Sequence, residues 1–100
     1  MAPYFIISDH ALARFAERQA GVASLKVQHR RRLLLSQLHR SVVFGEQLGN
    51  EELYLLPCGA VAAIVRLRSV RIVKTILTYD QALASMRSLW RHGPHWLVAS

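Results

Sequence analysis

The fold is decided by the stretch Ala60–Tyr79, which reads AVAAIVRLRSVRIVKTILTY. Its aliphatic residues form two runs, 60–68 and 70–79, and Ser69 stands between them. Runs of this kind are typical of buried strands, and the short interval between them indicates a tight connection. We therefore predict two neighbouring strands at the centre of a sheet.

The residues before this stretch predict two more strands and, ahead of those, two helices. Val42–Leu48 and Glu51–Leu56 flank the dipeptide Gly49-Asn50, which favours a hairpin with a two-residue turn. Apolar residues recur at helical spacing from Asp9 to about Ala20, and again from Ser24, a candidate N-cap, to about Arg40. Each of these helices therefore has one face to bury.

The two ends of the chain complete the predicted order. Pro3–Ile7 is short and apolar and favours a first strand, and Ser8 can cap the helix that follows. Asp80 can cap a closing helix to about Trp90, and 91–100 reads as an irregular tail. The fold class is therefore predicted as α+β: an N-terminal strand and two helices, then a four-stranded antiparallel meander and a C-terminal helix, in one domain over residues 1–100.

Composition limits the class of protein. One hundred residues, 52% of them hydrophobic, suffice for one core. The longest apolar runs are far shorter than the roughly 20 residues of a membrane helix, and the N-terminus lacks the basic region of a signal peptide. The single cysteine, Cys58, excludes an internal disulfide and is interpreted as structural. We expect a cytoplasmic protein with no membrane contact.

The charge of the chain points to a phosphate ligand. Thirteen Lys and Arg residues against six Asp and Glu residues give a formal net charge of +7. Lys26 and Lys74 are the only lysines, so the other cations are arginines, whose planar fork matches phosphate. The alternative is an arginine-rich composition inherited from a GC-rich genome. We interpret the charge as a surface for the RNA backbone.

Four consecutive basic residues stand out among the cations. The run His29–Arg32 lies on the second predicted helix, and no acidic residue occurs between Arg18 and Glu46. Such a run is usually a solvated helix face, but it can also follow a nucleic-acid backbone. The arginines that we predict to contact nucleic acid are Arg18, Arg30, Arg31, Arg32, Arg66, Arg68 and Arg71.

His10 and Arg14 lie one turn apart on the exposed side of the first predicted helix. An imidazole there could move a proton to or from the 2′-hydroxyl or the leaving oxygen of a phosphodiester. The guanidinium could hold the phosphate and offset its growing negative charge. The alternative is that Arg14 pairs with Glu17, three residues further along the helix.

The strand 70–79 places polar side chains inside an otherwise apolar sheet. Side chains alternate along a strand, so one face is predicted to carry Arg71, Val73, Thr75, Leu77 and Tyr79. The other face is predicted to carry Ile72, Lys74, Ile76 and Thr78. Each set puts hydroxyl groups beside a cation, although threonine is also a favoured strand residue in its own right.

The helix motif His10-Ala11-x-x-Arg14-x-x-Glu17-Arg18 and the strand motif Lys74-Thr75-Ile76-Leu77-Thr78-Tyr79 resemble those of the small ribonuclease toxins of the RelE and BrnT type, over roughly residues 5–88. The resemblance implies a metal-free active site without a cofactor, built on the sheet from His, Arg, Lys, Thr and Tyr residues. It also implies an acidic protein partner, an antitoxin or immunity protein. By resemblance, His10 and Arg14 match the helix pair, and Lys74 with Thr75 or Thr78 matches the last-strand position.

The sequence thus predicts a metal-independent endoribonuclease of toxin type, or a degenerate relative of one. His10 would be its acid or base, Arg14 its phosphate clamp, and the remaining catalytic residues Lys74, Thr75, Thr78 and Tyr79. No metal site is predicted, because His92 and His95 lack carboxylate or thiolate partners. The alternative is a non-enzymatic binding protein, such as a phage-type inhibitor, that uses the same basic surface on nucleic acid or on an acidic host protein.

Overall fold

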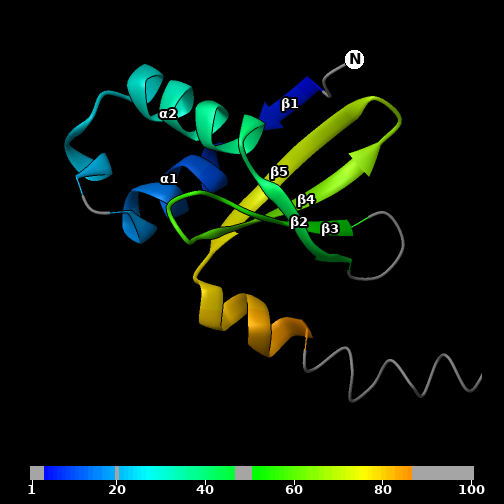
Figure 1. Cartoon of the computed structure of the whole chain (residues 1–100). Helices are drawn as coiled ribbons and strands as arrows, with labels where there is room; N and C mark the ends of the chain where they lie inside the picture. Colours follow the sequence, from blue (N-terminus) through cyan, green and yellow to red (C-terminus); the bar gives the residue numbers. More distant parts are fainter. Residues whose placement is uncertain (1–3, 20, 47–50, 87–100) are drawn as a thin grey trace, which may run out of the picture.

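The computed structural model describes residues 4–19, 21–46 and 51–86 of the chain, without the side chains of residues 45 and 46 (Figure 1). Its named elements are β1 (Tyr4–Ile7), α1 (Asp9–Arg18), the 3₁₀ turn η1 (Val22–Ser24), α2 (Val27–His39), β2 (Val42–Glu46), β3 (Glu51–Leu55), β4 (Val61–Leu67) and β5 (Val70–Leu77). Residues 79–86 form a further helix. The predicted α+β class is confirmed.

The sheet differs from the expected four-stranded antiparallel meander. It has five strands in the order β1-β5-β4-β3-β2, and it is mixed, because β1 pairs with β5 in parallel. The other three pairings are antiparallel. The reason lies in β5, whose outer backbone groups would be unpaired at an edge of the sheet. The short N-terminal strand satisfies them, beginning with the bond from the Tyr4 amide to the Ser69 carbonyl (3.1 Å).

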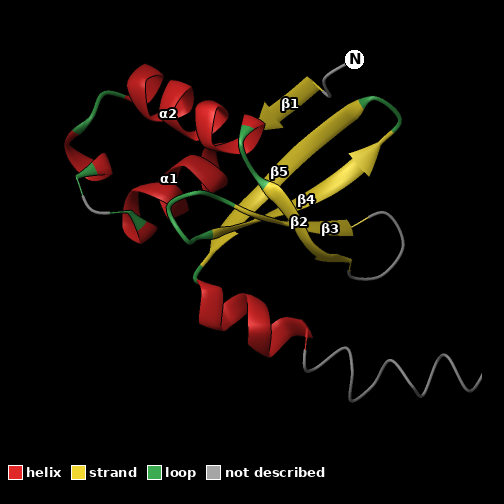
Figure 2. Ribbon diagram, viewed as in Figure 1, coloured by secondary structure: helices red, strands yellow, loops and turns green. Residues whose placement is uncertain are grey.

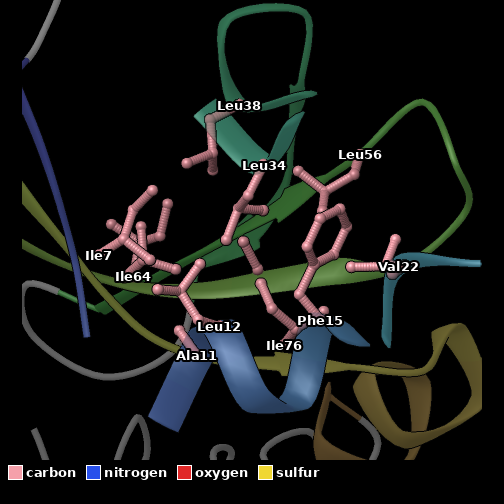
Figure 3. Close-up of a cluster of buried hydrophobic side chains, with 13 residues drawn as sticks. Ile7, Ala11, Leu12, Phe15, Val22, Leu34, Leu38, Leu56, Ile64 and Ile76 are labelled. Atoms are coloured by element: carbon pink, nitrogen blue, oxygen red, sulfur yellow. The ribbon is translucent and has the colours of Figure 1, made fainter. Parts of the chain in front are cut away.

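The main core lies between the sheet and the pair α1 and α2. From α1 it contains Ala11, Leu12 and Phe15, and from α2 Leu34 and Leu38 (Figure 3). The sheet contributes Ile7, Ala62, Ile64, Val73 and Ile76 to the same cluster. We call this side of the sheet the first face.

The opposite side of the sheet, the second face, carries a smaller core. Leu53 and Val61 are buried there against Ala82 of helix 79–86, and Phe44, Leu55, Ala63, Leu77 and Met86 pack around them. In Figure 2 helix 79–86 lies apart from α1 and α2. It covers the end of the second face where β5 finishes.

A β-bulge in β5 changes which side chains share a face. Ala63 pairs with Thr75, but its neighbour Ile64 pairs with Val73, so the register skips Lys74. Strict alternation was therefore the wrong prediction: Arg71 and Val73 lie on the first face, whereas Thr75 and Leu77 lie on the second. The extra residue is what shifts the pattern by one position.

The helix starts agree with the sequence at one place and differ at two. Ser8 caps α1, as predicted, by accepting the Ala11 amide (3.0 Å). The second helix begins at Val27, because Ser24 belongs to η1, where its hydroxyl donates to the Gly21 carbonyl. Gly21 has φ +84°, a left-handed conformation that glycine adopts without strain.

The closing helix is capped by Thr78 and not by Asp80. The Gln81 amide donates to the Thr78 hydroxyl, and the Thr78 amide donates to the Gln81 side-chain oxygen, both at 3.0 Å. This reciprocal pair is a capping box. It starts the helix two residues earlier than a cap at Asp80 would have done.

We expect Thr78→Ala to destabilise the protein by about 1 kcal/mol, because the first-turn amide of Gln81 loses its acceptor. For a domain of this size the melting temperature should fall by about 4–8 °C. Thermal unfolding followed by circular dichroism measures the change. Thr78→Ser keeps the hydroxyl and should leave the melting temperature almost unchanged; equal losses in both variants would contradict the capping role.

Helix α1 ends at Arg18, two residues earlier than predicted, and strands β3, β4 and β5 are each one or two residues shorter than predicted. The predicted Gly49-Asn50 turn, the end of the closing helix at Trp90 and the tail 91–100 lie outside the described residues. None of the helices in the described ranges is long and apolar enough to cross a membrane.

Candidate functional site

A small pocket opens between strands β3, β4 and β5. Its lining residues are Glu51, Glu52, Ala63, Ile64, Lys74 and Thr75. By register, Glu51, Ala63 and Thr75 point to the second face, so the pocket opens on the side of the sheet away from α1 and α2. The pocket thus brings together two of the predicted catalytic residues, Lys74 and Thr75.

The local sequence explains why a hollow forms there. Ala63 lies between the larger side chains of β3 and β5, and its methyl group leaves space above the sheet. Lys74 is the extra residue of the bulge, and its ammonium group lies 3.1 Å from Oε1 of Glu51 across the central strand. Bulges re-aim a side chain in this way, and they are frequent beside active sites.

The two charges of the pocket are accessible to solvent. The side chain of Lys74 is 53% exposed and that of Glu51 is 37% exposed. An ion pair with this exposure contributes little to stability, since water competes for both partners. The pair can therefore open without a large cost when another anion reaches the ammonium group.

The pocket volume is about 90 Å³. The space has room for a group of phosphate size. The ammonium group of Lys74 and the hydroxyl of Thr75 could bind an oxyanion in this space. The carboxylate of Glu51 could accept a proton beside it.

His10 and Arg14 are not among the residues that line this pocket. They lie on α1, which packs on the first face of the sheet, whereas Thr75 points to the second face. Arg14 instead donates to Glu17 at 2.6 Å, which was the alternative reading. That hydrogen bond from Arg14 lowers the pKa of Glu17 below its ordinary value, with a smaller effect of the nearby positive charges.

Thr78 and Tyr79 are also held outside the pocket. Thr78 is occupied as the cap of helix 79–86. The ring of Tyr79 packs against Phe44 with ring centroids 5.2 Å apart. Neither residue is among those that line the pocket.

The arginines of the helices make several contacts within the chain. Arg30 donates to the carbonyls of Ala23 (2.7 Å) and Leu25 (3.0 Å), so it fixes the segment that precedes α2. Arg31 reaches the Ile7 carbonyl at 3.4 Å. The Nε atom of Arg18 is buried. Arg32 is exposed, and of these four it is the best placed for a solvent-borne phosphate.

The arginines of the sheet divide between a buried acid and the solvent. On the first face, Glu52 is buried, with Arg66 3.5 Å and Arg71 3.7 Å from its carboxylate oxygens. Arg71 also donates to the Arg68 carbonyl at 2.9 Å. Arg68 itself is exposed in the turn between β4 and β5, with φ +54°. It is therefore the sheet arginine most open to an external anion.

The sequence interpretation missed Glu51 and Glu52. They are the only adjacent pair of acidic residues in the sequence, which has a net charge of +7. Two neighbouring carboxylates in so basic a chain could have marked them as candidate site residues. Alternation along β3 sends them to opposite faces, Glu51 to Lys74 and Glu52 to the two arginines. The meeting of Glu51 with Lys74 could not be predicted, because it depends on the bulge.

We assign no metal ligands, since within residues 4–19, 21–46 and 51–86 no three His, Cys, Asp or Glu side chains are grouped around a common point.

Comparison of the chain with protein-family models, with curated proteins and with solved structures gave no match.

Proposed function

We propose that this protein is a metal-independent endoribonuclease of the cytosol that cleaves RNA at the Glu51–Lys74–Thr75 pocket. The observation that carries the proposal is the solvent-exposed ion pair of Glu51 and Lys74, 3.1 Å apart beside the hydroxyl-bearing Thr75 in a space of phosphate size. The net charge of +7 supports a polyanionic substrate.

The three side chains are suited to cleavage by the substrate's own 2′-hydroxyl. Glu51 would accept the proton of that hydroxyl as its oxygen attacks the adjacent phosphorus. Lys74 would bind a phosphate oxygen and give a proton to the departing 5′-oxygen, and Thr75 would hold the phosphate by hydrogen bonding. The products would be a 2′,3′-cyclic phosphate and a 5′-hydroxyl end.

A relationship to the RelE and BrnT type of ribonuclease toxin is part of this proposal. It is supported by the order of one strand, two helices, a sheet and a closing helix, and by the lining of the pocket, which includes Lys74 and Thr75 of the last strand. His10 and Arg14 do not line the pocket, which departs from the expected set, so Glu51 takes the role of the base. An acidic protein partner is then expected to neutralise the basic surface.

The direct test is to incubate the purified protein with single-stranded RNA in the presence of EDTA. We expect discrete fragments that end in a 2′,3′-cyclic phosphate, which acid opens to a 2′- or 3′-phosphate. The Glu51→Gln variant, purified in the same way, serves as the control for contaminating nuclease. Intact RNA after incubation at high protein concentration would contradict the proposed cleavage.

A second candidate is RNA binding without cleavage. It is favoured by the contents of the pocket, which among its lining residues has no histidine and whose ammonium group is already paired with Glu51. Such a protein would shift labelled RNA in a gel and leave its length unchanged. The same incubation therefore separates the two candidates.

A further inference from the structure

The second face carries a compact apolar patch at the end that helix 79–86 does not cover. Register fixes its two rows across β1, β5 and β4: Tyr4, Val70 and Leu67 lie side by side, and so do Ile6, Ile72 and Val65. We name these six residues the β1–β5–β4 patch. In Figure 1 this end of the β4–β5 hairpin points away from α1 and α2.

The patch is unusually exposed for its composition. Tyr4 is 67% exposed, Leu67 48% and Ile6 45%, although all three are large and apolar. Helix 79–86 packs instead on Leu53 and Val61, further along the sheet. Contiguous apolar side chains on a solvated surface mark binding sites more often than isolated ones do.

We infer that the β1–β5–β4 patch binds the unpaired bases of single-stranded RNA, with Tyr4 as a stacking platform. The inference rests on the proposed function and adds the class of RNA substrate. Aromatic rings and aliphatic side chains offer a surface to the flat faces of bases whatever their sequence. In a duplex these faces are stacked on one another and are out of reach, so the patch selects unpaired RNA.

The surroundings of the patch favour a nucleic acid over an uncharged apolar partner. Tyr4 is tied to the β4–β5 turn by its bond to the Ser69 carbonyl, and the next residue back along that turn, Arg68, is an exposed cation. Val65, at the other border, pairs with Glu51 of the pocket. Bases on the patch would thus have a cation for their phosphates at one border and the proposed cleavage pocket at the other.

The test measures binding separately from cleavage. A fluorescein-labelled, single-stranded 2′-O-methyl RNA has no nucleophilic 2′-hydroxyl, so anisotropy reports its affinity while the probe stays intact. We expect Tyr4→Ala to raise the Kd about 10-fold or more, as the loss of one stacked base does. Tyr4→Phe keeps the ring and should stay within about twofold of the original protein.

Val42→Ala is the matched control, because Val42 is a similarly exposed apolar side chain on the same face, at the opposite edge of the sheet. It should leave the Kd unchanged. A duplex of the same sequence should bind more weakly than the single strand and should not respond to Tyr4→Ala. Circular dichroism checks that each variant is folded.

The outcomes separate the two proposals. If folded Tyr4→Ala binds the single strand as well as the original protein, or if the duplex binds equally well, the stacking inference is wrong and cleavage at the pocket is unaffected. If Tyr4→Ala alters only the sedimentation of the protein, the patch joins two copies of the chain and the inference is again wrong. If the original protein binds no RNA, the proposed function fails with it.

Discussion

Glu51→Gln is expected to slow RNA cleavage by about 10²- to 10⁴-fold, the range that a positioned general base contributes. Glutamine has the shape of glutamate and can still accept a hydrogen bond from Lys74, but it does not take up the proton of the 2′-hydroxyl. The change also removes a negative charge beside the phosphate site. RNA should therefore bind the variant as tightly as before, or more tightly.

Initial rates on an end-labelled RNA with one scissile site measure the first effect, and anisotropy with the 2′-O-methyl probe measures the second. Glu17→Gln is the control, because Glu17 is an exposed glutamate that pairs with Arg14 on α1, beyond the sheet. It should cleave at the original rate. Equal cleavage rates in Glu51→Gln and Glu17→Gln would remove Glu51 from the reaction.

Phe15→Ala should destabilise the fold by about 3–5 kcal/mol, the usual cost of truncating a buried aromatic side chain. Phe15 of α1 is fully buried in the core on the first face of the sheet, together with Val22, Leu34 and Ile76 (Figure 3). Its removal leaves a cavity that these rigid neighbours fill only in part. A domain of this size has about 5–15 kcal/mol of stability in total, so the loss approaches unfolding.

Urea unfolding followed by circular dichroism gives the free energy of unfolding for this variant. Val27→Ala on α2 is the control, since Val27 is 56% exposed at the first turn of that helix. Surface changes of this kind usually stay within about 0.5 kcal/mol. A loss below about 1 kcal/mol in Phe15→Ala would mean that Phe15 is not central to the core.

The sequence predicted the local elements because their signals are local. Ser8, the spacing of Leu12 and Phe15, and the two apolar runs around Ser69 act over a few residues, and the corresponding cap, helix and hairpin are observed. The closing cap was assigned to Asp80 although Thr78 and Gln81 form the capping box. That pattern was present in the sequence, in a segment interpreted as the end of a strand.

The location of the site was beyond local signals. One added residue at Lys74 moves Thr75 to the second face, and the ammonium group then meets Glu51, which is 23 positions away in the chain. The sequence of the strand 70–79 does not by itself fix this register. The register follows from the burial of both Val73 and Ile76 in the main core. The same burial packs α1, the helix that carries His10 and Arg14, on the first face.

The amino-acid sequence by itself determined the α+β class, the order of the helices and strands, and a strongly cationic chain, because these follow from composition and short-range periodicity. Tertiary structure alone decided the parallel partner of β5, the pairing of Glu51 with Lys74 and the exposure of Tyr4. Each of these depends on which distant strands share hydrogen bonds, and that choice is made by the burial of the whole core and not by any single segment.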